Sequence, residues 1–441
     1  MDSSIVAIII SLIVVILFIT NKVPMSFIAM GGSVAMAILI PEMKLSQAYA
    51  GFSATGWQMT VGMLIVSAAL FETGVAQSIG KKISNSFFVK QERLFIITIS
   101  IICTLMSAFM SNNGTVAIWM PIIAVIASGS KGKIRSKMVI FVAGTAAVVG
   151  GGTTLIGSTS QLVANSVLQS YKGYEEGMKV FDMTKIMLPV CIVQVLFWAT
   201  IGYSLLKHVL KPESPDFDKG NMYATAPIIE DDIYKSIPRY KRVISIGTML
   251  LCIFLFITSG FNPLKNYFNI GIIGMLGGCI IIVTGCIPVK KAYSELPWDI
   301  LFTIGGIAGI GTGLEVSGGG ALIANSVLNL FGGQNASIMV LTAVIAVLTS
   351  VLTNFMQNNA TAAMLTPICI SMALEMGISP LPWVILIAST SNFAIATSYG
   401  TAVNLQILPA GYKFSDFVKI GGPLLIIMII TVVISSLLFL F

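Results

Sequence analysis

Two short polar segments lie inside long apolar stretches of the sequence, and their residue types could bind small ions. Residues 111–115 read SNNGT and residues 357–361 read QNNAT, in the similar contexts SAFMSNNGTVAIWMPI and TNFMQNNATAAMLTPI. A carboxamide without a partner at membrane depth costs several kcal/mol, so such segments are expected only where protein, ions or water satisfy them. The repeated segment therefore predicts a binding site.

The side chains of these segments suit an anion and a cation together. If a helix begins at each segment, its free N–H groups and positive dipole end favour an anion. Hydroxyl, amide and unwound carbonyl oxygens can coordinate a small hard cation such as sodium. Neither segment contains Lys or Arg, so sodium would balance the charge of the anion and couple its binding to the ion gradient. Packing between membrane helices is the alternative role of Ser, Thr and Asn, but the repetition of the whole pattern favours a site.

The composition indicates a polytopic membrane protein. Of the 441 residues, 56% are hydrophobic and 10% are charged, which excludes an ordinary soluble domain. The net charge of +7 fits basic loops at the ends of spans, so no nucleic-acid partner is expected. A single histidine, His208, and six cysteines without metal-ligand spacing disfavour a His-based metal site and an enzyme.

Apolar runs long enough to cross the hydrocarbon core define the expected elements. The first of them lacks the basic n-region of a signal peptide and is expected to be retained. Two pairs of runs meet at the polar segments, at residues 94–128 and 336–374, and two long runs, 139–166 and 382–408, are interrupted by Gly, Ser and Thr. Simple spans are expected at residues 4–20, 23–41, 57–79, 181–206, 243–260, 269–288, 298–317 and 417–441.

Basic residues predict how these elements are oriented. Both outer ends of the 94–128 pair carry Lys and Arg, so this pair is expected to be a re-entrant hairpin that enters from the cytoplasm. No Lys or Arg lies between Lys291 and Lys413, so the 336–374 pair should enter from the opposite side. A layout of about ten spans with both termini outside places most of the 25 Lys and Arg residues in the cytoplasm.

Matching interruptions in the two halves are typical of the inverted repeats of secondary transporters. Each half then contains three spans, a hairpin, a broken span and a last span, and we expect the four interruptions to converge. The expected division is residues 1–207 for the first repeat, 208–242 for a cytoplasmic linker and 243–441 for the inverted second repeat.

Carboxylates offer an alternative coupling chemistry. Glu72, Asp299 and Glu315 lie within or at the ends of apolar runs and could carry protons, although a carboxylate near a span end can also reach water or cap a helix. Residues 318–320 and 332–333 are glycines without the Gly-Lys-Ser/Thr pattern of a phosphate-binding loop, so they are expected in loops or in helix packing.

The quoted motifs resemble those of a known family. SAFMSNNGTVAIWMPI with GGTTLIGSTSQLVAN, and TNFMQNNATAAMLTPI with a break at Gly400, Thr401 and Asn404, resemble the divalent anion sodium symporter family of the ion transporter superfamily. That family includes sodium-coupled dicarboxylate, citrate and sulfate transporters, and the resemblance covers essentially the whole chain. It implies an all-α, elevator-type homodimer in the plasma membrane, with a scaffold domain and a transport domain that contains both hairpins.

Binding residues follow from this resemblance by position. The first sodium site would use Ser107, Ser111, Asn112 and the Gly157 carbonyl, and the second would use Thr353, the Met356 carbonyl, Asn358 and the Gly400 carbonyl. Substrate would contact Ser111, Asn112, Asn113, Ser158, Thr159, Gln357, Asn358, Asn359 and Thr401.

The sequence departs from the family at the substrate positions. Asn113 and Asn359 stand where the family has Thr, and Gln357 stands where it has Ser. The first break reads GSTSQ instead of GTPPN, and Ala402 and Val403 replace the second pair of prolines. Longer amides shrink the cavity and add donors and acceptors. The sequence thus predicts a secondary active, sodium-coupled transporter of a small divalent anion such as a di- or tricarboxylate, with a proton-coupled transporter or exchanger of the same fold, or an anion channel, as the alternatives.

Overall fold

The protein is all-helical throughout the part of the chain that the structure describes. The computed structural model describes residues 2–20, 22–75, 91–130, 133–210, 237–258, 267–331, 333, 336–398 and 400–441. These residues form nineteen α-helices and two 3-10 helices and include no strand, so the predicted all-α fold is confirmed. Most of the predicted 208–242 linker, and several of the basic residues that set the predicted orientation, lie outside the described residues.

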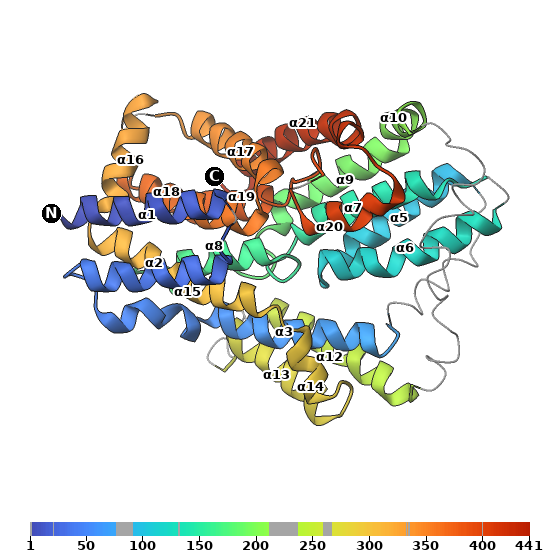
Figure 1. Ribbon diagram of the computed structural model, residues 1–441, viewed down its shortest axis with the longest axis horizontal. Helices are drawn as coiled ribbons and strands as arrows, with labels where there is room; N and C mark the ends of the chain where they lie inside the picture. The colour runs from blue at the N-terminus through green and yellow to red at the C-terminus, as the bar shows by residue number, and fades with distance from the viewer. Residues whose placement is uncertain are drawn as a thin grey trace.

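One group of helices carries the first three predicted spans of each half. Figure 1 shows it along the left and the bottom of the view. It consists of α1 (Ser3–Thr20), α2 (Met25–Leu39), η1 (Leu45–Ser53), α3 (Thr55–Glu72), α12 (Arg239–Thr258), α13 (Ile270–Val283), α14 (Val289–Glu295), α15 (Trp298–Val316) and α16 (Gly319–Leu330).

Glycine lets the helices of this group pack at backbone contact. Helix α3 packs on α13, and α2 packs on α15. A Cβ atom at Gly62 would lie 1.9 Å from the carbonyl oxygen of Gly274, and one at Gly306 would lie 2.7 Å from the backbone nitrogen of Met30. Small residues at such crossings are typical of membrane helices, because close packing and not the exclusion of water drives their association.

The second group contains the polar segments and the interrupted runs. It consists of α5 (Glu92–Ser107), α6 (Asn112–Gly129), α7 (Ser136–Gly151), α8 (Thr159–Gln169), α9 (Thr184–Ala199), α10 (Ile201–Val209), α17 (Ile338–Phe355), α18 (Asn358–Glu375), α19 (Leu381–Thr390), α20 (Ala402–Ile407), η5 (Leu408–Ala410) and α21 (Phe414–Phe439).

Each polar segment lies at the turn between two helices. The first turn joins α5 to α6 and the second joins α17 to α18. Pro121 of α6 and Pro367 of α18 occupy the same position relative to the start of their helices. Figure 1 shows α5 and α6 running inward from the right of the view and α17 and α18 from the left, so that the two turns approach each other near the middle.

Both interrupted runs are broken helices, and the second break is longer than its polar residues suggest. Helix α7 ends at Gly151 and α8 begins at Thr159, whereas α19 already ends at Thr390 and α20 begins at Ala402. Two carboxamides stabilise the second break, one from the neighbouring hairpin and one from the predicted interruption itself. The Nδ2 atom of Asn354 donates to the carbonyl of Phe393 at 3.0 Å, and that of Asn404 donates to the carbonyl of Ala394 at 2.7 Å.

The structure differs from the predicted elements in three further places. The expected span at residues 181–206 is a bent pair, because α9 and α10 meet at Thr200 with an angle of 54°. Arg93 donates from Nε to the Ala199 carbonyl at 2.7 Å, which satisfies an acceptor at the end of α9. Helices α14 and α16 were not expected, and α16 follows Gly318, whose φ of +72° suits glycine.

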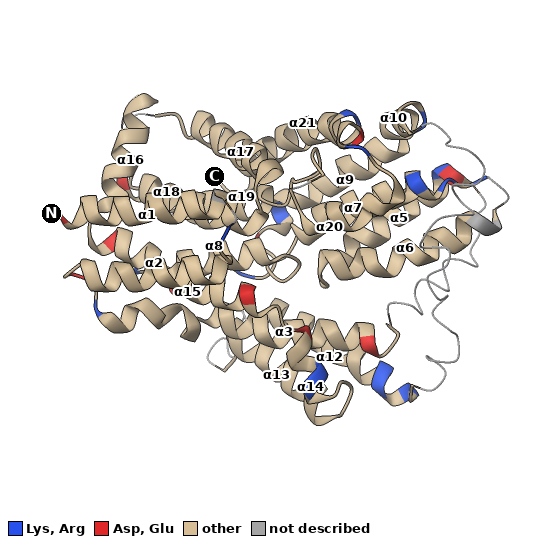
Figure 2. Cartoon of the chain, viewed as in Figure 1, with Lys and Arg blue, Asp and Glu red and all other residues tan. Residues whose placement is uncertain are grey.

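Several helices are suited to crossing a membrane. Five helical segments in the described ranges are long and apolar enough, and α9 with α10 would make a sixth; seven shorter apolar helices accompany them. The protein is thus a multi-pass membrane protein, while the count of about ten spans stays a prediction. Figure 2 shows many Lys and Arg residues toward the right-hand end of the view, where α5, α10 and α12 reach.

Candidate binding site

The two hairpin turns and the two breaks converge on one cavity of about 830 Å³. Ser107 and Thr353 are fully buried, at the ends of α5 and α17. All the other predicted site residues line the cavity: Ser111, Asn112, Asn113, Gly157, Ser158, Thr159, Met356, Gln357, Asn358, Asn359, Gly400 and Thr401.

Each hairpin turn brings a helix N-terminus to this cavity. Ser111 precedes α6, and its Oγ accepts the backbone N–H of Gly114 at 3.2 Å. Gln357 stands at the same place before α18, with extended backbone. The first N–H groups of a helix have no partner within the helix and carry the positive end of its dipole. The cavity therefore receives two sets of donors that suit negatively charged groups.

A cluster of oxygens surrounds the amide of Asn112. One terminal atom of this amide lies 2.6 Å from Ser107 Oγ and 3.2 Å from the carbonyl oxygens of Gly157 and Ala147. As a nitrogen, this atom can donate its two N–H groups among these three oxygens. As an oxygen, it completes a set of four oxygens that suits a small hard cation.

The second hairpin repeats this arrangement. Thr353 Oγ1 lies 2.8 Å from Asn358 Oδ1, so the hydroxyl and the amide are five residues apart in both hairpins. The same hydroxyl donates to the carbonyl of Ser391 at 2.5 Å, at the start of the second break. In each hairpin, the side-chain amide of the asparagine that begins the second helix thus lies against a buried hydroxyl of the preceding helix.

Glycine allows each break to approach its hairpin. A Cβ atom at Gly157 would lie 2.8 Å from the Ser107 carbonyl oxygen, and one at Gly400 would lie 2.7 Å from the Thr353 carbonyl oxygen. Each break also carries a threonine whose Oγ1 donates to a carbonyl at the neighbouring hairpin: Thr154 to Ala108, and Thr397 to Asn354.

Two hydrogen bonds connect the halves of the site. Thr159 Oγ1, at the start of α8, donates to Asn359 Oδ1 of α18 at 2.8 Å. Asn392 Nδ2, in the second break, donates to Ser160 Oγ at 3.2 Å. These bonds link residues of the two predicted repeats, so the two hairpins and breaks form one continuous polar site.

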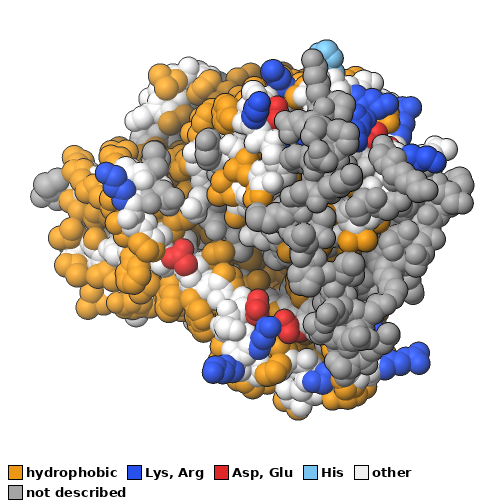
Figure 3. Space-filling view, turned by 45° about the vertical axis from the view of Figure 1, so that its right-hand side comes forward, with side chains coloured by type: hydrophobic (Ala, Val, Ile, Leu, Met, Phe, Trp, Pro, Cys, Tyr) orange, Lys and Arg blue, Asp and Glu red, His pale blue; other side chains and the backbone are white. Residues whose placement is uncertain are grey.

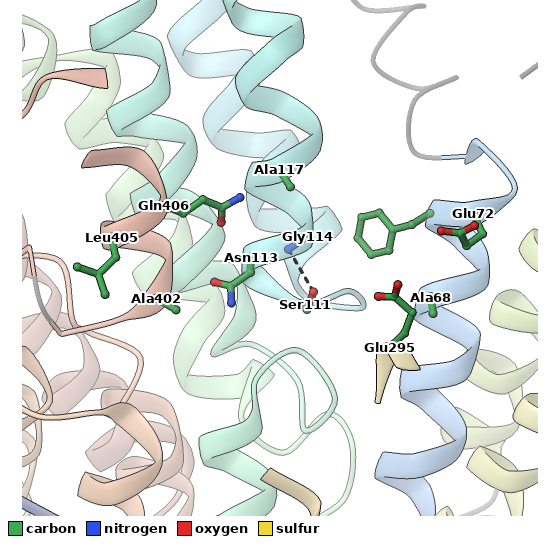
Figure 4. Close-up of a pocket in the computed structure, with 11 residues that line it drawn as sticks. Ala68, Glu72, Ser111, Asn113, Gly114, Ala117, Glu295, Ala402, Leu405 and Gln406 are labelled. Atoms are coloured by element: carbon green, nitrogen blue, oxygen red, sulfur yellow. Dashed lines mark hydrogen bonds between the residues drawn. The ribbon is translucent and has the colours of Figure 1, made fainter. Parts of the chain in front are cut away.

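The charges around the cavity are negative. Its described lining contains no Lys or Arg, but Glu295 and Asp299 take part in it. A second cavity of about 720 Å³ shares Ser111, Asn113 and Glu295 with the first and adds Glu72 and Gln406. In Figure 4, Glu72 and Glu295 lie on the opposite side of this space from Asn113 and Gln406.

The carboxylates considered from the sequence lie in different surroundings. Asp299 lines the central cavity and accepts the hydroxyl of Ser26. Glu72 Oε1 lies 2.9 Å from Lys291 Nζ, and its hydrogen bond and charge raise the pKa of Lys291. Glu315 lies in neither cavity lining and accepts the backbone N–H of Lys172 at 3.2 Å.

Sequence reasoning missed Glu295 and Gln406 at the cavities. Glu295 lies between two lysines, Lys290 and Lys291, and Trp298. This sequence context is that of an ordinary carboxylate at the membrane interface. Within the described residues, no group of three or more His, Cys, Asp and Glu side chains could hold a metal ion.

Comparisons with known proteins point to transport. Residues 15–388 match the model of a protein family described as citrate transporter. The uncharacterized transporter YfbS of Escherichia coli is 34% identical over 156 residues, which are 35% of this chain and 25% of that protein. The sodium-dependent dicarboxylate transporter SdcS of Staphylococcus saprophyticus is 25% identical over 381 residues, which are 80% of this chain and 70% of that protein.

A solved structure shares the fold. The structure of MtrF from Neisseria gonorrhoeae superposes with a TM-score of 0.63 at 14% sequence identity, over 89% of this chain and 82% of that one. At this identity the likeness shows the fold alone. In sequence, the chain matches about a quarter of the length of the first curated relatives.

Proposed function

We propose, since this chain belongs to the citrate transporter family, that it is a secondary active transporter that couples uptake of a small divalent anion, such as a di- or tricarboxylate, to sodium. The family match also confirms the resemblance drawn from the motifs. One observation carries the proposal: two helix N-termini and two unwound breaks line a single cavity whose described lining has no Lys or Arg.

The two helix N-termini support a divalent anion. An anionic group at α6 and a second at α18 would each meet free backbone N–H groups and the positive end of a helix dipole. Carboxamide donors add to each end, and polar groups held in place bind charge without further reorganisation. We propose that the anion contacts Ser111, Asn112, Asn113, Ser158, Thr159, Gln357, Asn358, Asn359 and Thr401.

The oxygen clusters support sodium as the coupling ion. One terminal atom of the Asn112 amide lies 2.6 to 3.2 Å from a hydroxyl and two carbonyl oxygens, and Thr353 and Asn358 make the matching pair. Neutral oxygens bind a hard monovalent cation, which would offset the charge of the anion where no basic side chain lines the cavity. We propose Ser107, Ser111, Asn112 and Gly157 for one sodium ion, and Thr353, Met356, Asn358 and Gly400 for the other.

We extend the proposal to the architecture of the resembled family. The matched hydroxyl–amide pairs, glycines and threonines support two inverted repeats, residues 1–207 and 243–441. The group of helices that holds the hairpins and breaks would be the transport domain of an elevator, and the glycine-packed group would be the scaffold of a homodimer. The gathering of Lys and Arg toward one end (Figure 2) supports a plasma-membrane orientation with both termini outside.

Uptake by purified protein in proteoliposomes tests the proposal. Radiolabelled citrate, succinate and sulfate are offered with an inward sodium gradient, with an equal potassium gradient, and with neither. We expect at least one of these anions to accumulate only with the sodium gradient. Equal uptake with and without the sodium gradient would contradict the proposal of sodium coupling.

Substitution of the asparagines that begin α6 and α18 tests the site. Asn112→Ala and Asn358→Ala should each reduce sodium-driven uptake by roughly tenfold or more, because a hydrogen bond to a charged group contributes about 1.5–3 kcal/mol. Gln91→Ala, at the start of α5 and outside both cavity linings, is the matched amide control. Full activity of both cavity variants, with unchanged thermal unfolding, would contradict the assignment.

Proton coupling is the second candidate, and Asp299 favours it. This carboxylate lines the central cavity and could carry a proton in place of sodium. Uptake driven by a pH gradient without sodium, and lost in Asp299→Asn, would support this candidate over the first. Sodium dependence retained in Asp299→Asn would exclude it.

A further inference from the structure

The corner between α9 and α10 combines features of a lipid contact and lies outside both cavity linings. Leu188, Ile192 and Leu196 of α9 are 56%, 53% and 56% exposed. Their spacing of four residues puts them on one face of the helix, and this stripe ends one turn before the bend of 54° at Thr200. In a membrane protein, such a stripe marks where acyl chains lie, and its end marks the level of the lipid headgroups.

Two basic residues flank a tyrosine at this corner. The guanidinium carbon of exposed Arg93 lies 5.8 Å from the centroid of the Tyr203 ring, and Nζ of exposed Lys207 lies 4.4 Å from it. Arg93 is fixed in place because its Nε donates to the Ala199 carbonyl at 2.7 Å. A tyrosine between cations is the residue pattern found where a membrane protein meets the headgroup region.

The carboxylate that accepts the Tyr203 hydroxyl already has a cationic partner. Glu92 binds Arg135, with Arg135 Nη2 2.7 Å from Glu92 Oε2, and it also accepts the hydroxyl of Tyr203 at 3.1 Å. Neither Arg93 nor Lys207 has a carboxylate partner among the residues that the structure describes. Within the described part of the chain, the corner therefore presents two positive charges without a carboxylate partner.

Helix α10 adds an amphipathic surface beside these charges. Ile201 is 65% exposed at its start, Lys207 and His208 are exposed near its end, and Leu206 is fully buried. Helices with this distribution lie in the membrane interface and gain affinity from anionic lipids. Figure 3 shows the single histidine at the upper edge of the molecule, with Lys and Arg side chains along the same edge.

We propose that this corner binds the phosphate of an anionic phospholipid. Arg93 and Lys207 contact the headgroup, the Tyr203 ring holds the two cations together, and an acyl chain lies along Leu188, Ile192 and Leu196. The charge of the corner favours an anionic lipid over a zwitterionic one, and the apolar stripe favours a lipid over a soluble phosphate. Bound lipid would hold α10 in the interface, next to the helices that carry the first hairpin.

Lipid retention on the purified protein tests this proposal. The protein is placed in mixed nanodiscs of phosphatidylglycerol and phosphatidylcholine, released, and weighed with its bound lipids by native mass spectrometry. Wild type should retain phosphatidylglycerol preferentially, and Lys207→Gln should lower that preference about fivefold, the effect expected for one basic residue at an anionic surface. Arg93→Gln should do the same but also loses the bond to Ala199, so Lys207→Gln is the cleaner variant.

Matched controls separate this site from general electrostatics. Lys185→Gln removes an exposed lysine at the other end of α9 and should leave the lipid preference unchanged. An unchanged preference in Lys207→Gln, an equal loss in Lys185→Gln, or displacement of the retained lipid by millimolar inorganic phosphate would each overturn the proposal. The readout is lipid binding, so it does not depend on the substrate or on sodium coupling.

Discussion

At the residue scale, one hydrogen bond determines which atom of Asn359 can meet an anion. Thr159 Oγ1 donates to Asn359 Oδ1 at 2.8 Å, so the remaining terminal atom of the amide is Nδ2, a donor. The resembled family has threonine at this position. The longer asparagine can therefore place a donor farther into the cavity while remaining fixed by a residue of the other repeat.

Asn359→Asp tests whether the amide of residue 359 presents its nitrogen or its oxygen to the anion. The substitution replaces the donor by an acceptor and adds a negative charge, so we expect anion affinity to fall roughly tenfold or more. Thr159→Val removes the fixing bond together with a hydroxyl that we propose to contact the anion, and it should weaken binding by at least about twofold to tenfold, the usual net contribution of one hydrogen bond. Thermal-shift titration with the transported anion measures both, with Asn359→Thr as the control that restores the family residue. Wild-type affinity in Asn359→Asp would mean that the amide meets the substrate with its oxygen or not at all.

The sequence predicts site residues only where their context is unusual. Asn112 and Asn358 were predictable because amides inside apolar runs need partners, and both lie at the central cavity. Glu295 and Gln406 were not, because a polar residue near a span end has many ordinary roles. The bond between Thr159 and Asn359 was not predictable either, since it depends on how two distant helices face each other.

At the element scale, the breaks depend on glycines that pack against the hairpins. A Cβ atom at Gly157 would lie 2.6 Å from the Gly151 carbonyl oxygen and 2.8 Å from that of Ser107. Gly157→Ala must therefore displace backbone next to the Asn112 oxygen cluster. We expect the sodium concentration for half-maximal uptake to rise by roughly tenfold, and the free energy of unfolding to fall by about 1–3 kcal/mol, the usual cost of overpacking.

Gly400→Ala and Gly247→Ala provide the comparison. Gly400 meets the Thr353 carbonyl oxygen in the same way, whereas a Cβ atom at Gly247 of α12 would have nothing within 4 Å. Sodium titration of uptake should therefore give a similar loss in Gly400→Ala and none in Gly247→Ala. If the sodium concentration for half-maximal uptake were the same in all three variants, the glycines of the breaks would not be holding sodium ligands in place.

Helical runs and polar interruptions predicted most elements, and the exceptions have local causes. The hairpin turns and the first break were predictable because polar residues interrupt apolar runs there. The earlier start of the second break depends on Asn354, a residue of the hairpin that donates to the Phe393 carbonyl. At the bend at Thr200, Arg93 of another helix bonds the Ala199 carbonyl, a contact that no pattern within residues 181–206 signals.

At the scale of the whole molecule, the two halves make the same contacts with different residues. Ser107 with Asn112 corresponds to Thr353 with Asn358, and Thr154 with Ala108 corresponds to Thr397 with Asn354. A site shared by two such halves would give each end of the proposed divalent anion an equivalent anchor. The proposed inverted repeat also has the second half entering the membrane from the opposite side, and in Figure 1 the hairpins run inward from opposite ends.

Thiol labelling tests the orientation that this arrangement needs. Lys44 lies between α2 and η1 and Lys290 lies in α14; both are exposed, and the predicted topology places the first outside and the second in the cytoplasm. Five of the native cysteines are buried and Cys279 is exposed, so the Cys279→Ser variant should react little with the maleimide before a new cysteine is added. In intact cells, a membrane-impermeant maleimide should label Lys44→Cys but not Lys290→Cys, and permeabilised cells should show both. Labelling of only Lys290→Cys in intact cells would reverse the termini and, with them, the side from which each hairpin enters.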